Sequence, residues 1–129
     1  MNVVADTNIF LAVALDESEK DAIIQLTSEA NAVSPEILLY EVGNALTAML
    51  KRKQLTLKEA LLAFEIISAI PVRLVSADIR HAVKLAAEYN IYAYDAYFLQ
   101  CALYLSCPLL TLDKRMKQVA NDLKIEVLE

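Results

Sequence analysis

Two acidic residues stand directly after short apolar segments of the chain. Asp6 follows the apolar residues 3–5, and Asp113 follows residues 109–112. In open parallel sheets, ligands bind at the carboxyl ends of the strands, and an acid at this position can hold a cation. Asp is also a favoured N-cap of a helix, and each of the two, taken alone, fits that role equally well.

Two further acids lie beside apolar surface within predicted helices. Asp95 shares a helical face with Phe98, Leu99 and Ala102, all of which are apolar. A carboxylate buried there without a cation costs several kcal/mol or becomes protonated, and a metal ion would remove that cost. Glu41 lies mid-helix at the border of an apolar stripe, where a solvated glutamate is the simpler interpretation. Together the four acids indicate a metal site.

The residue types of this site favour one kind of chemistry. Carboxylate oxygens with no cysteine or histidine nearby select Mg²⁺ or Mn²⁺ rather than zinc. Such ions activate a water, polarise a phosphate and stabilise the leaving oxygen. The single glycine, Gly43, lies within a predicted helix, which excludes the glycine-rich dinucleotide and P-loop signatures. The single histidine, His81, has no nucleophile-elbow pattern near it, so acyl transfer is poorly supported.

Composition limits the class of protein further. The 129 residues are the length of one domain with one buried core. Of these residues 57% are hydrophobic, which favours helices buried on more than one side or an apolar oligomer interface. The net charge of −5 weighs against a nucleic-acid partner unless bound cations reverse the local sign. No apolar run reaches the ~18 residues of a membrane span and no leader opens the chain, so we expect a cytoplasmic protein. Cys101 and Cys107 fit packed core thiols.

Apolar and helical periodicities alternate along the chain. We expect five short strands, at residues 2–5, 32–33, 72–75, 109–112 and 125–128. We expect helices at residues 7–15, 18–30, 34–53, 56–70, 76–90, 94–106 and 114–122. Because short apolar strands that alternate with helices form parallel sheets, we predict an α/β fold with helices on both faces of the sheet.

Polar residues mark where three of these helices begin. Ser34 followed by Pro35 predicts an N-cap and a first helical residue. Thr56 and Glu59 have the spacing of a capping box. Ser76 is the expected cap of the helix that follows the third strand.

The order and spacing of these short motifs resemble those of the PIN-domain nucleases, and the length resembles that of the VapC toxins of toxin–antitoxin pairs. The resemblance covers essentially the whole chain. It rests on Asp6-Thr7-Asn8, on Glu41-Val42-Gly43-Asn44-Ala45-Leu46, on Tyr94-Asp95-Ala96 and on Thr111-x-Asp113.

The resemblance implies a PIN-like domain over residues 1–129, with a five-stranded parallel sheet, and a metal-dependent endoribonuclease activity. The residues that it implies as ligands of one or two Mg²⁺ or Mn²⁺ ions are Asp6, Glu41, Asp95 and Asp113. Asn8 and Thr111 would support the site as polar neighbours that hold the ligand geometry. An activated water would attack the phosphodiester in line, without a covalent intermediate.

The resemblance also implies partners: an RNA substrate, a second copy of the chain and a small antitoxin that blocks the site. Candidate contacts with RNA phosphates or with the antitoxin are Lys51, Arg52, Lys53, Lys114, Arg115 and Lys117. Ordinary solvated charges at helix ends are the alternative for the whole set.

Two other functions stay open. A PIN-like fold can act as a catalytically silent binding module that assembles with partners. A metal-dependent phosphohydrolase for small phosphoesters is the third possibility. The haloacid-dehalogenase type would need an Asp-x-Asp pair where this chain has Asp6-Thr7-Asn8.

Overall fold

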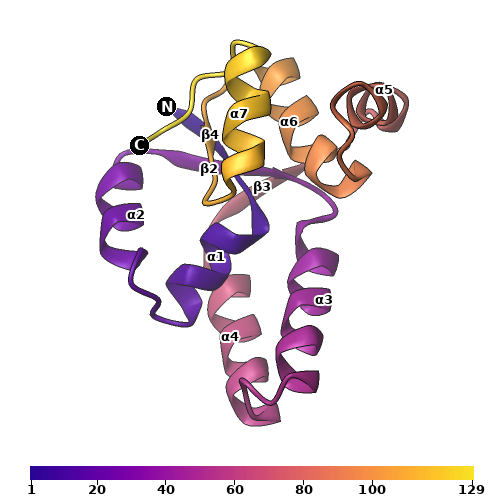
Figure 1. The fold of residues 1–129 in the computed structure, drawn as a ribbon. Coiled ribbons are helices and arrows are strands. Elements are labelled where there is room, and N and C mark those ends of the chain that lie inside the picture. Colours follow the sequence, from indigo (N-terminus) through magenta and orange to yellow (C-terminus); the bar gives the residue numbers. More distant parts are fainter.

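One parallel sheet organises the protein, whose computed structural model describes residues 1–129. Its four strands lie in the order β3-β2-β1-β4 (Figure 1). The strands are β1 (Asn2–Ala5), β2 (Asn31–Pro35), β3 (Val72–Val75) and β4 (Leu109–Leu110). The helices are α1 (Thr7–Ala14), α2 (Lys20–Thr27), α3 (Leu38–Lys51), α4 (Leu57–Ala69), α5 (Ile79–Tyr89), α6 (Ala93–Leu105) and α7 (Lys114–Asp122). The predicted α/β fold with a parallel sheet is confirmed.

The sheet has four strands rather than the five expected. The segment predicted as a closing strand, residues 125–128, is reduced to an isolated parallel bridge between Leu109 and Val127. Strand β4 is also shorter than predicted, because β1 ends at Ala5, which pairs with Leu110. Beyond that pair, Thr111 has no neighbouring strand to bond.

The segment after Val33 is strand rather than helix. Ser34 and Pro35 pair with Leu74 and Val75 of β3, so the prediction of an N-cap at Ser34 is wrong. The hydroxyl of Ser34 is fully buried and donates to the carbonyl of Ala5, at 2.7 Å. This bond fixes Ser34 to β1, and α3 begins only at Leu38.

The other two predicted helix starts have different outcomes. The capping box of α4 is confirmed: Glu59 N–H donates to Thr56 Oγ1 at 3.2 Å, and Thr56 N–H donates to Glu59 Oε1 at 2.9 Å. The cap of α5 is Asp78 rather than Ser76. An Asp78 oxygen accepts from the N–H of His81 at 3.1 Å, whereas the Ser76 hydroxyl donates to Glu36.

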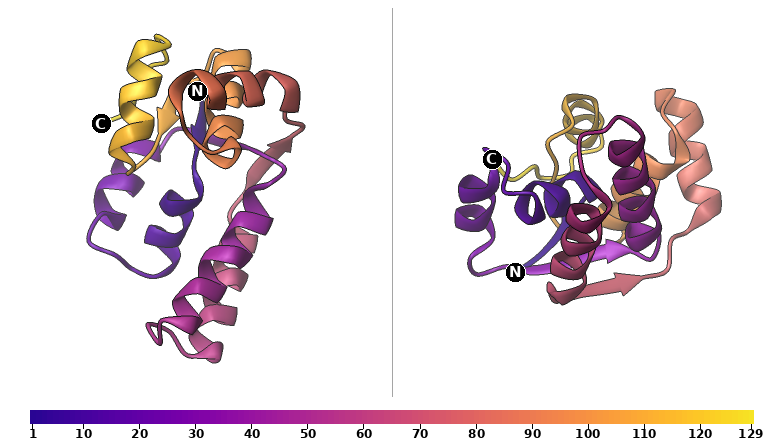
Figure 2. Two further views of the ribbon diagram at one scale, coloured as in Figure 1. Left: turned by 45° about the vertical axis from the view of Figure 1, so that its right-hand side comes forward. Right: turned by 90° about the horizontal axis from the view of Figure 1, so that it is seen from below.

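Helices cover both faces of the sheet, as predicted. Connections between parallel strands are right-handed as a rule, which puts the helices of the β1-to-β2 and β2-to-β3 connections on one face. These helices, α1 to α4, pack against one another. The strand order then reverses, and α6 packs on β1 and β2 from the other face, with α5 and α7 beside it. In Figures 1 and 2, α3 and α4 lie side by side and project from the sheet as a pair. None of the seven helices combines the length and apolar character that a membrane span requires.

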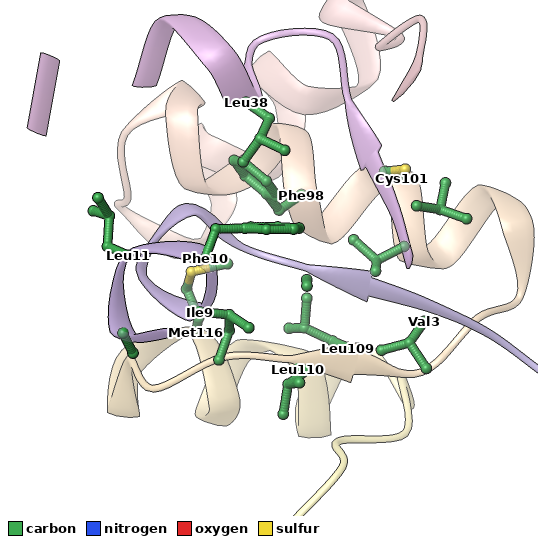
Figure 3. Packing of buried hydrophobic residues seen from close by; sticks show 14 of the residues in the cluster. Val3, Ile9, Phe10, Leu11, Leu38, Phe98, Cys101, Leu109, Leu110 and Met116 are labelled. Atoms are coloured by element: carbon green, nitrogen blue, oxygen red, sulfur yellow. The ribbon is translucent and has the colours of Figure 1, made fainter. Parts of the chain in front are cut away.

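The hydrophobic core joins strands and helices from both layers. Phe10 of α1, Leu38 of α3 and Phe98 of α6 are directed into the same core, which Figure 3 shows from close by. Cys101 is also buried in it, as predicted, and burial raises the pKa of its thiol to about 11. The packed core holds the ends of β1 and β4 in place, and the candidate site lies at these ends.

Candidate functional site

The candidate site lies where the strand order of the sheet reverses. Strands β2 and β3 follow β1 on one side, whereas β4 lies on the other side of β1. Asp6 follows the last residue of β1, and Asp113 comes three residues after the end of β4. Crevices at such a reversal, outside the carboxyl ends of the strands, are where open α/β sheets bind ligands.

A pocket of about 150 Å³ at this edge brings the four predicted acids together. Its lining is contributed by four separate stretches of the chain: Asp6, Thr7, Asn8, Glu41, Asn44, Ala45, Ala48, Asp95, Phe98, Asp113 and Met116. Each acid lies at the N-terminal end of a helix. Asp6 and Asp113 are the N-cap residues of α1 and α7, while Glu41 and Asp95 lie in the first turns of α3 and α6. Because helix N-termini carry partial positive charge, they stabilise this cluster of carboxylates.

Asp6 is the most buried of the four acids, with 5% of its surface exposed. Its main-chain N–H donates to the carbonyl of Leu110 at 3.2 Å, and its Oδ2 accepts a hydrogen bond from the hydroxyl of Thr111. It makes no side-chain cap bond to α1, so helix capping does not explain this carboxylate. Its other oxygen, Oδ1, is buried without any hydrogen-bond partner.

Asp113 both caps a helix and lines the pocket. Its Oδ1 accepts from the N–H of Met116 at 2.9 Å, as an N-cap does. Its own N–H donates to Thr111 Oγ1 at 3.0 Å. Since the same hydroxyl donates to Asp6, the buried Thr111 connects the two acids through one oxygen.

Glu41 of α3 and Asp95 of α6 are the other two acids that line the pocket. Glu41 is not mid-helix as expected, because α3 begins at Leu38 and puts it in the first turn. The apolar face predicted for Asp95 is confirmed at Phe98, which lines the same pocket. Phe98 and Met116 supply apolar walls beside the carboxylates, which lowers the local polarity.

Burial, and then neighbouring carboxylates, raise the pKa values of Asp6, Glu41 and Asp95. Burial is the main cause for Asp6, whose pKa rises to about 6, and the charges of Asp113 and Asp95 raise it further against the Thr111 hydrogen bond. Burial, and then the charge of Asp95, raises the pKa of Glu41. Burial, and then the charge of Asp113, raises the pKa of Asp95. Such mutual repulsion is relieved when a cation binds between the acids.

The donor set of this pocket fits a hard divalent cation. It offers carboxylate and amide oxygens and neither cysteine nor histidine, and the buried Asp6 Oδ1 has no other partner. No three of the acids converge closely enough to form a complete metal centre on their own.

The other predicted site residues differ in their distance from the pocket. Asn8 lines the pocket and Thr111 contacts Asp6, while their role as supports of a metal site stays a prediction. The predicted basic contacts Arg52, Lys114 and Arg115 do not line it. Arg52 ends α3 at the tip of the projecting pair, and Lys114 is exposed at the start of α7.

Arg115 and Lys117 have partners within the chain. A guanidinium N–H of Arg115 donates to the carbonyl of Tyr89 at 2.7 Å, and the Lys117 ammonium pairs with Glu129 at 3.6 Å. Sequence reasoning missed Thr7 and Asn44 as pocket residues. Both lie within the short motifs named above: Thr7 directly follows Asp6, and Asn44 comes three residues after Glu41. This closeness to an acid was the signal available in the sequence.

A larger cavity, of about 730 Å³, lies away from the acids. It is mostly apolar, is lined by α1, α2, the strands β1, β2 and β3 and the end of α4, and shares no residue with the carboxylate pocket. Its lack of clustered acids or other reactive side chains makes it unsuited to catalysis.

The fold and the pocket define an α/β protein with an acidic ligand site at the carboxyl edge of a parallel sheet. The sequence of residues 3–122 matches the family model of the PIN domain. The chain therefore belongs to the PIN domain family, whose members are in general nucleases. No curated protein matches the sequence.

Two solved structures share the fold. PAE2754 from Pyrobaculum aerophilum superimposes with a TM-score of 0.72 at 18% identity, over 92% of this chain and 79% of that one. VapBC2 from Rickettsia felis, solved bound to a DNA fragment from their promoter, has a TM-score of 0.68 at 16% identity, over 100% of this chain and 98% of that one.

Proposed function

We propose that this PIN domain is a divalent-metal-dependent endoribonuclease that hydrolyses RNA phosphodiesters. The observation that carries the proposal is the pocket itself, with four carboxylates at the reversal of strand order. Its most buried member, Asp6, has one oxygen held by Thr111 and the other without a partner. We propose Asp6, Glu41, Asp95 and Asp113 as the ligands of Mg²⁺ or Mn²⁺.

Different residues of the chain have different roles in the proposed reaction. When bound, the divalent ion supplies charge that activates a water and stabilises the phosphate as it reacts. Thr111 orients the Asp6 carboxylate through Oδ2, so that Oδ1 remains free for a ligand. Phe98 and Met116 limit the access of water to the acids and strengthen electrostatic interactions there.

We further propose that the protein is the toxin of a toxin–antitoxin pair and acts as a homodimer in the cytoplasm. The VapBC2 structure supports this, since it shares the fold over the whole chain. Exposed apolar side chains also support protein partners. Leu57, Leu61 and Leu62 of α4 are each more than half exposed, and the apolar cavity beside α2 is open. Light scattering on the purified protein tests the dimer. We expect a mass twice that of one chain.

Cleavage of labelled total RNA by the purified protein tests the activity. We expect discrete cutting with Mn²⁺ or Mg²⁺ that EDTA abolishes and that Asp6→Asn reduces to background. Asp21→Asn is the matched control, because it removes the same charge from an exposed position in the first turn of α2. It should cut like the wild type.

Two other outcomes would replace the proposal. No cutting with any metal, together with calorimetry that detects no cation binding, would leave the silent binding module as the function. Hydrolysis of a generic phosphomonoester without cleavage of RNA would identify a small-molecule phosphohydrolase.

A further inference from the structure

Thr7 presents a second buried oxygen that has no partner. It is the first residue of α1, directly after Asp6, and it lines the carboxylate pocket. Only 9% of its surface is exposed, and its hydroxyl oxygen neither donates nor accepts a hydrogen bond. Buried polar groups are rarely left in this state, because the loss of hydration is then uncompensated. An unpartnered hydroxyl at the wall of a pocket points to a ligand.

The start of α1 has two backbone donors without a partner in the chain: the N–H groups of Thr7 and Asn8 make no hydrogen bond, whereas that of Ile9 donates to the carbonyl of Asp6 at 3.2 Å. The first N–H groups of any helix have no partner within it, and a side chain at the N-cap usually accepts from one of them. Asp6 holds the N-cap position of this eight-residue helix, yet it makes no cap bond. Oδ2 of its carboxylate accepts from Thr111 instead, and Oδ1 has no partner. The two unpartnered N–H groups at the N-terminus of α1 therefore remain available to an anion that binds beside Asp6.

We propose that the Thr7 hydroxyl and the backbone N–H groups of Thr7 and Asn8 form a phosphate-binding subsite beside the carboxylates. The Thr7 hydroxyl would donate to a non-bridging oxygen of a nucleotide phosphate, and the backbone N–H groups would add further donors to the same group. The inference rests on the proposed function, since it assigns one part of the substrate to one wall of the same pocket.

The negative charges of the pocket require a cation to be bound before a phosphate can bind. Asp6, Asp95 and Asp113 repel a phosphate as long as no cation lies between them. Thr7 and the amides are neutral donors, so they add no charge that would compete with the cation for the acids. The subsite should accordingly bind phosphate only together with a divalent ion.

Two variants separate this role from a structural one. Thr7→Val keeps the shape and removes the hydroxyl, and Thr7→Ser keeps the hydroxyl. Because that hydroxyl has no partner within the chain, Thr7→Val breaks no internal hydrogen bond and should fold as stably as the wild type.

Calorimetry with uridine 5′-monophosphate as the probe, with and without Mg²⁺, tests the subsite. We expect Mg²⁺ alone to bind all three proteins equally. With Mg²⁺ present, the nucleotide should bind Thr7→Val about tenfold more weakly than the wild type, and Thr7→Ser within about twofold of it, because a hydrogen bond to a charged group is lost only in the first. Without Mg²⁺ no protein should bind it.

Each contrary result has its own meaning. Equal nucleotide affinity of the wild type and Thr7→Val, or no nucleotide binding by a wild type that does bind Mg²⁺, overturns the subsite and leaves the metal-dependent nuclease intact. A wild type that binds no Mg²⁺ overturns the proposed function itself, and the subsite with it.

Discussion

The hydroxyl of Thr111 donates a hydrogen bond to Oδ2 of Asp6, a residue 105 positions earlier in the chain. The same hydroxyl oxygen accepts the N–H of Asp113. One buried threonine thus sets the position of an acid on each side of the strand reversal, and the two acids cannot move independently.

Replacement of Thr111 by valine should weaken the site through Asp6. Its hydrogen bond lowers the pKa of Asp6, so the pKa should rise further in Thr111→Val. The buried carboxylate also loses a charge-assisted bond, which should lower the free energy of unfolding at pH 7 by about 1.5–3 kcal/mol. Metal affinity measured against pH should shift toward higher pH, and Thr111→Ser should restore the wild-type profile. An unshifted profile in the valine variant would argue against this role.

The raised pKa of Asp6 predicts how stability depends on pH in EDTA. An exposed aspartate has a pKa of 3.8, whereas the pKa of Asp6 in the folded protein is about 6. Between these values the folded state binds more protons than the unfolded state, so stability should fall as pH rises from about 4 to about 6. The full effect of this shift is about 3 kcal/mol at pH 7. Urea unfolding at a series of pH values measures it.

Asp6→Asn should remove this dependence. The amide stays neutral across the range, so the metal-free variant should be more stable than the wild type at pH 7 while being inactive on RNA. Added Mg²⁺ should raise the melting temperature of the wild type and leave that of the variant unchanged. A variant less stable than the wild type in EDTA at pH 7 would contradict the assignment of a strained, buried carboxylate.

Ser34 should matter for the site although it does not line the pocket. Its hydroxyl binds the carbonyl of Ala5, the residue before Asp6. Ser34→Ala leaves that buried carbonyl without this donor, at a cost of about 1–3 kcal/mol in unfolding free energy. We also expect a several-fold loss of Mg²⁺ affinity in calorimetry. Ser28→Ala, which removes an exposed serine hydroxyl bonded to the carbonyl of Gln25, is the control and should change neither quantity.

Lys114 and Arg115 should behave differently despite being neighbours. Lys114 is exposed and has no ion-pair partner, so Lys114→Gln should weaken RNA binding and reduce its salt slope by about one, without a change in stability. Arg115 binds the carbonyl of Tyr89 at the end of α5. Arg115→Gln should lower the free energy of unfolding by about 0.5–1 kcal/mol, the value of one exposed hydrogen bond. Identical salt slopes for wild type and Lys114→Gln would exclude Lys114 from the RNA surface.

Local patterns predicted much of this fold because they act over a few residues. The capping box of Thr56 and Glu59 forms as its spacing indicates. The signal at Ser34 and Pro35 was misleading, since their pairing with β3 depends on residues 40 positions further along the chain. The same long-range dependence shortened β4, whose length is set by where β1 ends.

The site was predictable to a similar extent. The four acids could be selected because two follow short apolar segments and two lie beside apolar surface in predicted helices, and they do line one pocket. The resemblance indicated Thr111 as a support of the site. Its bond to Asp6 and the unpartnered hydroxyl of Thr7 depend on how distant segments pack together, which no local pattern contains. The partner of Arg115 is likewise on another helix.

Helix α1 borders both the carboxylate pocket and the apolar cavity. Its first residues, Thr7 and Asn8, face the acids, while Ile9, Phe10 and Val13 line the apolar cavity. At 1.5 Å per residue, this helix is about 12 Å long, so that a tilt at one end also displaces the other end. A molecule that enters the cavity and tilts α1 therefore changes the position of Asp6 as well, without touching any acid. By reciprocity, whatever binds at Asp6 and prefers one tilt of α1 alters the affinity of the cavity to the same extent.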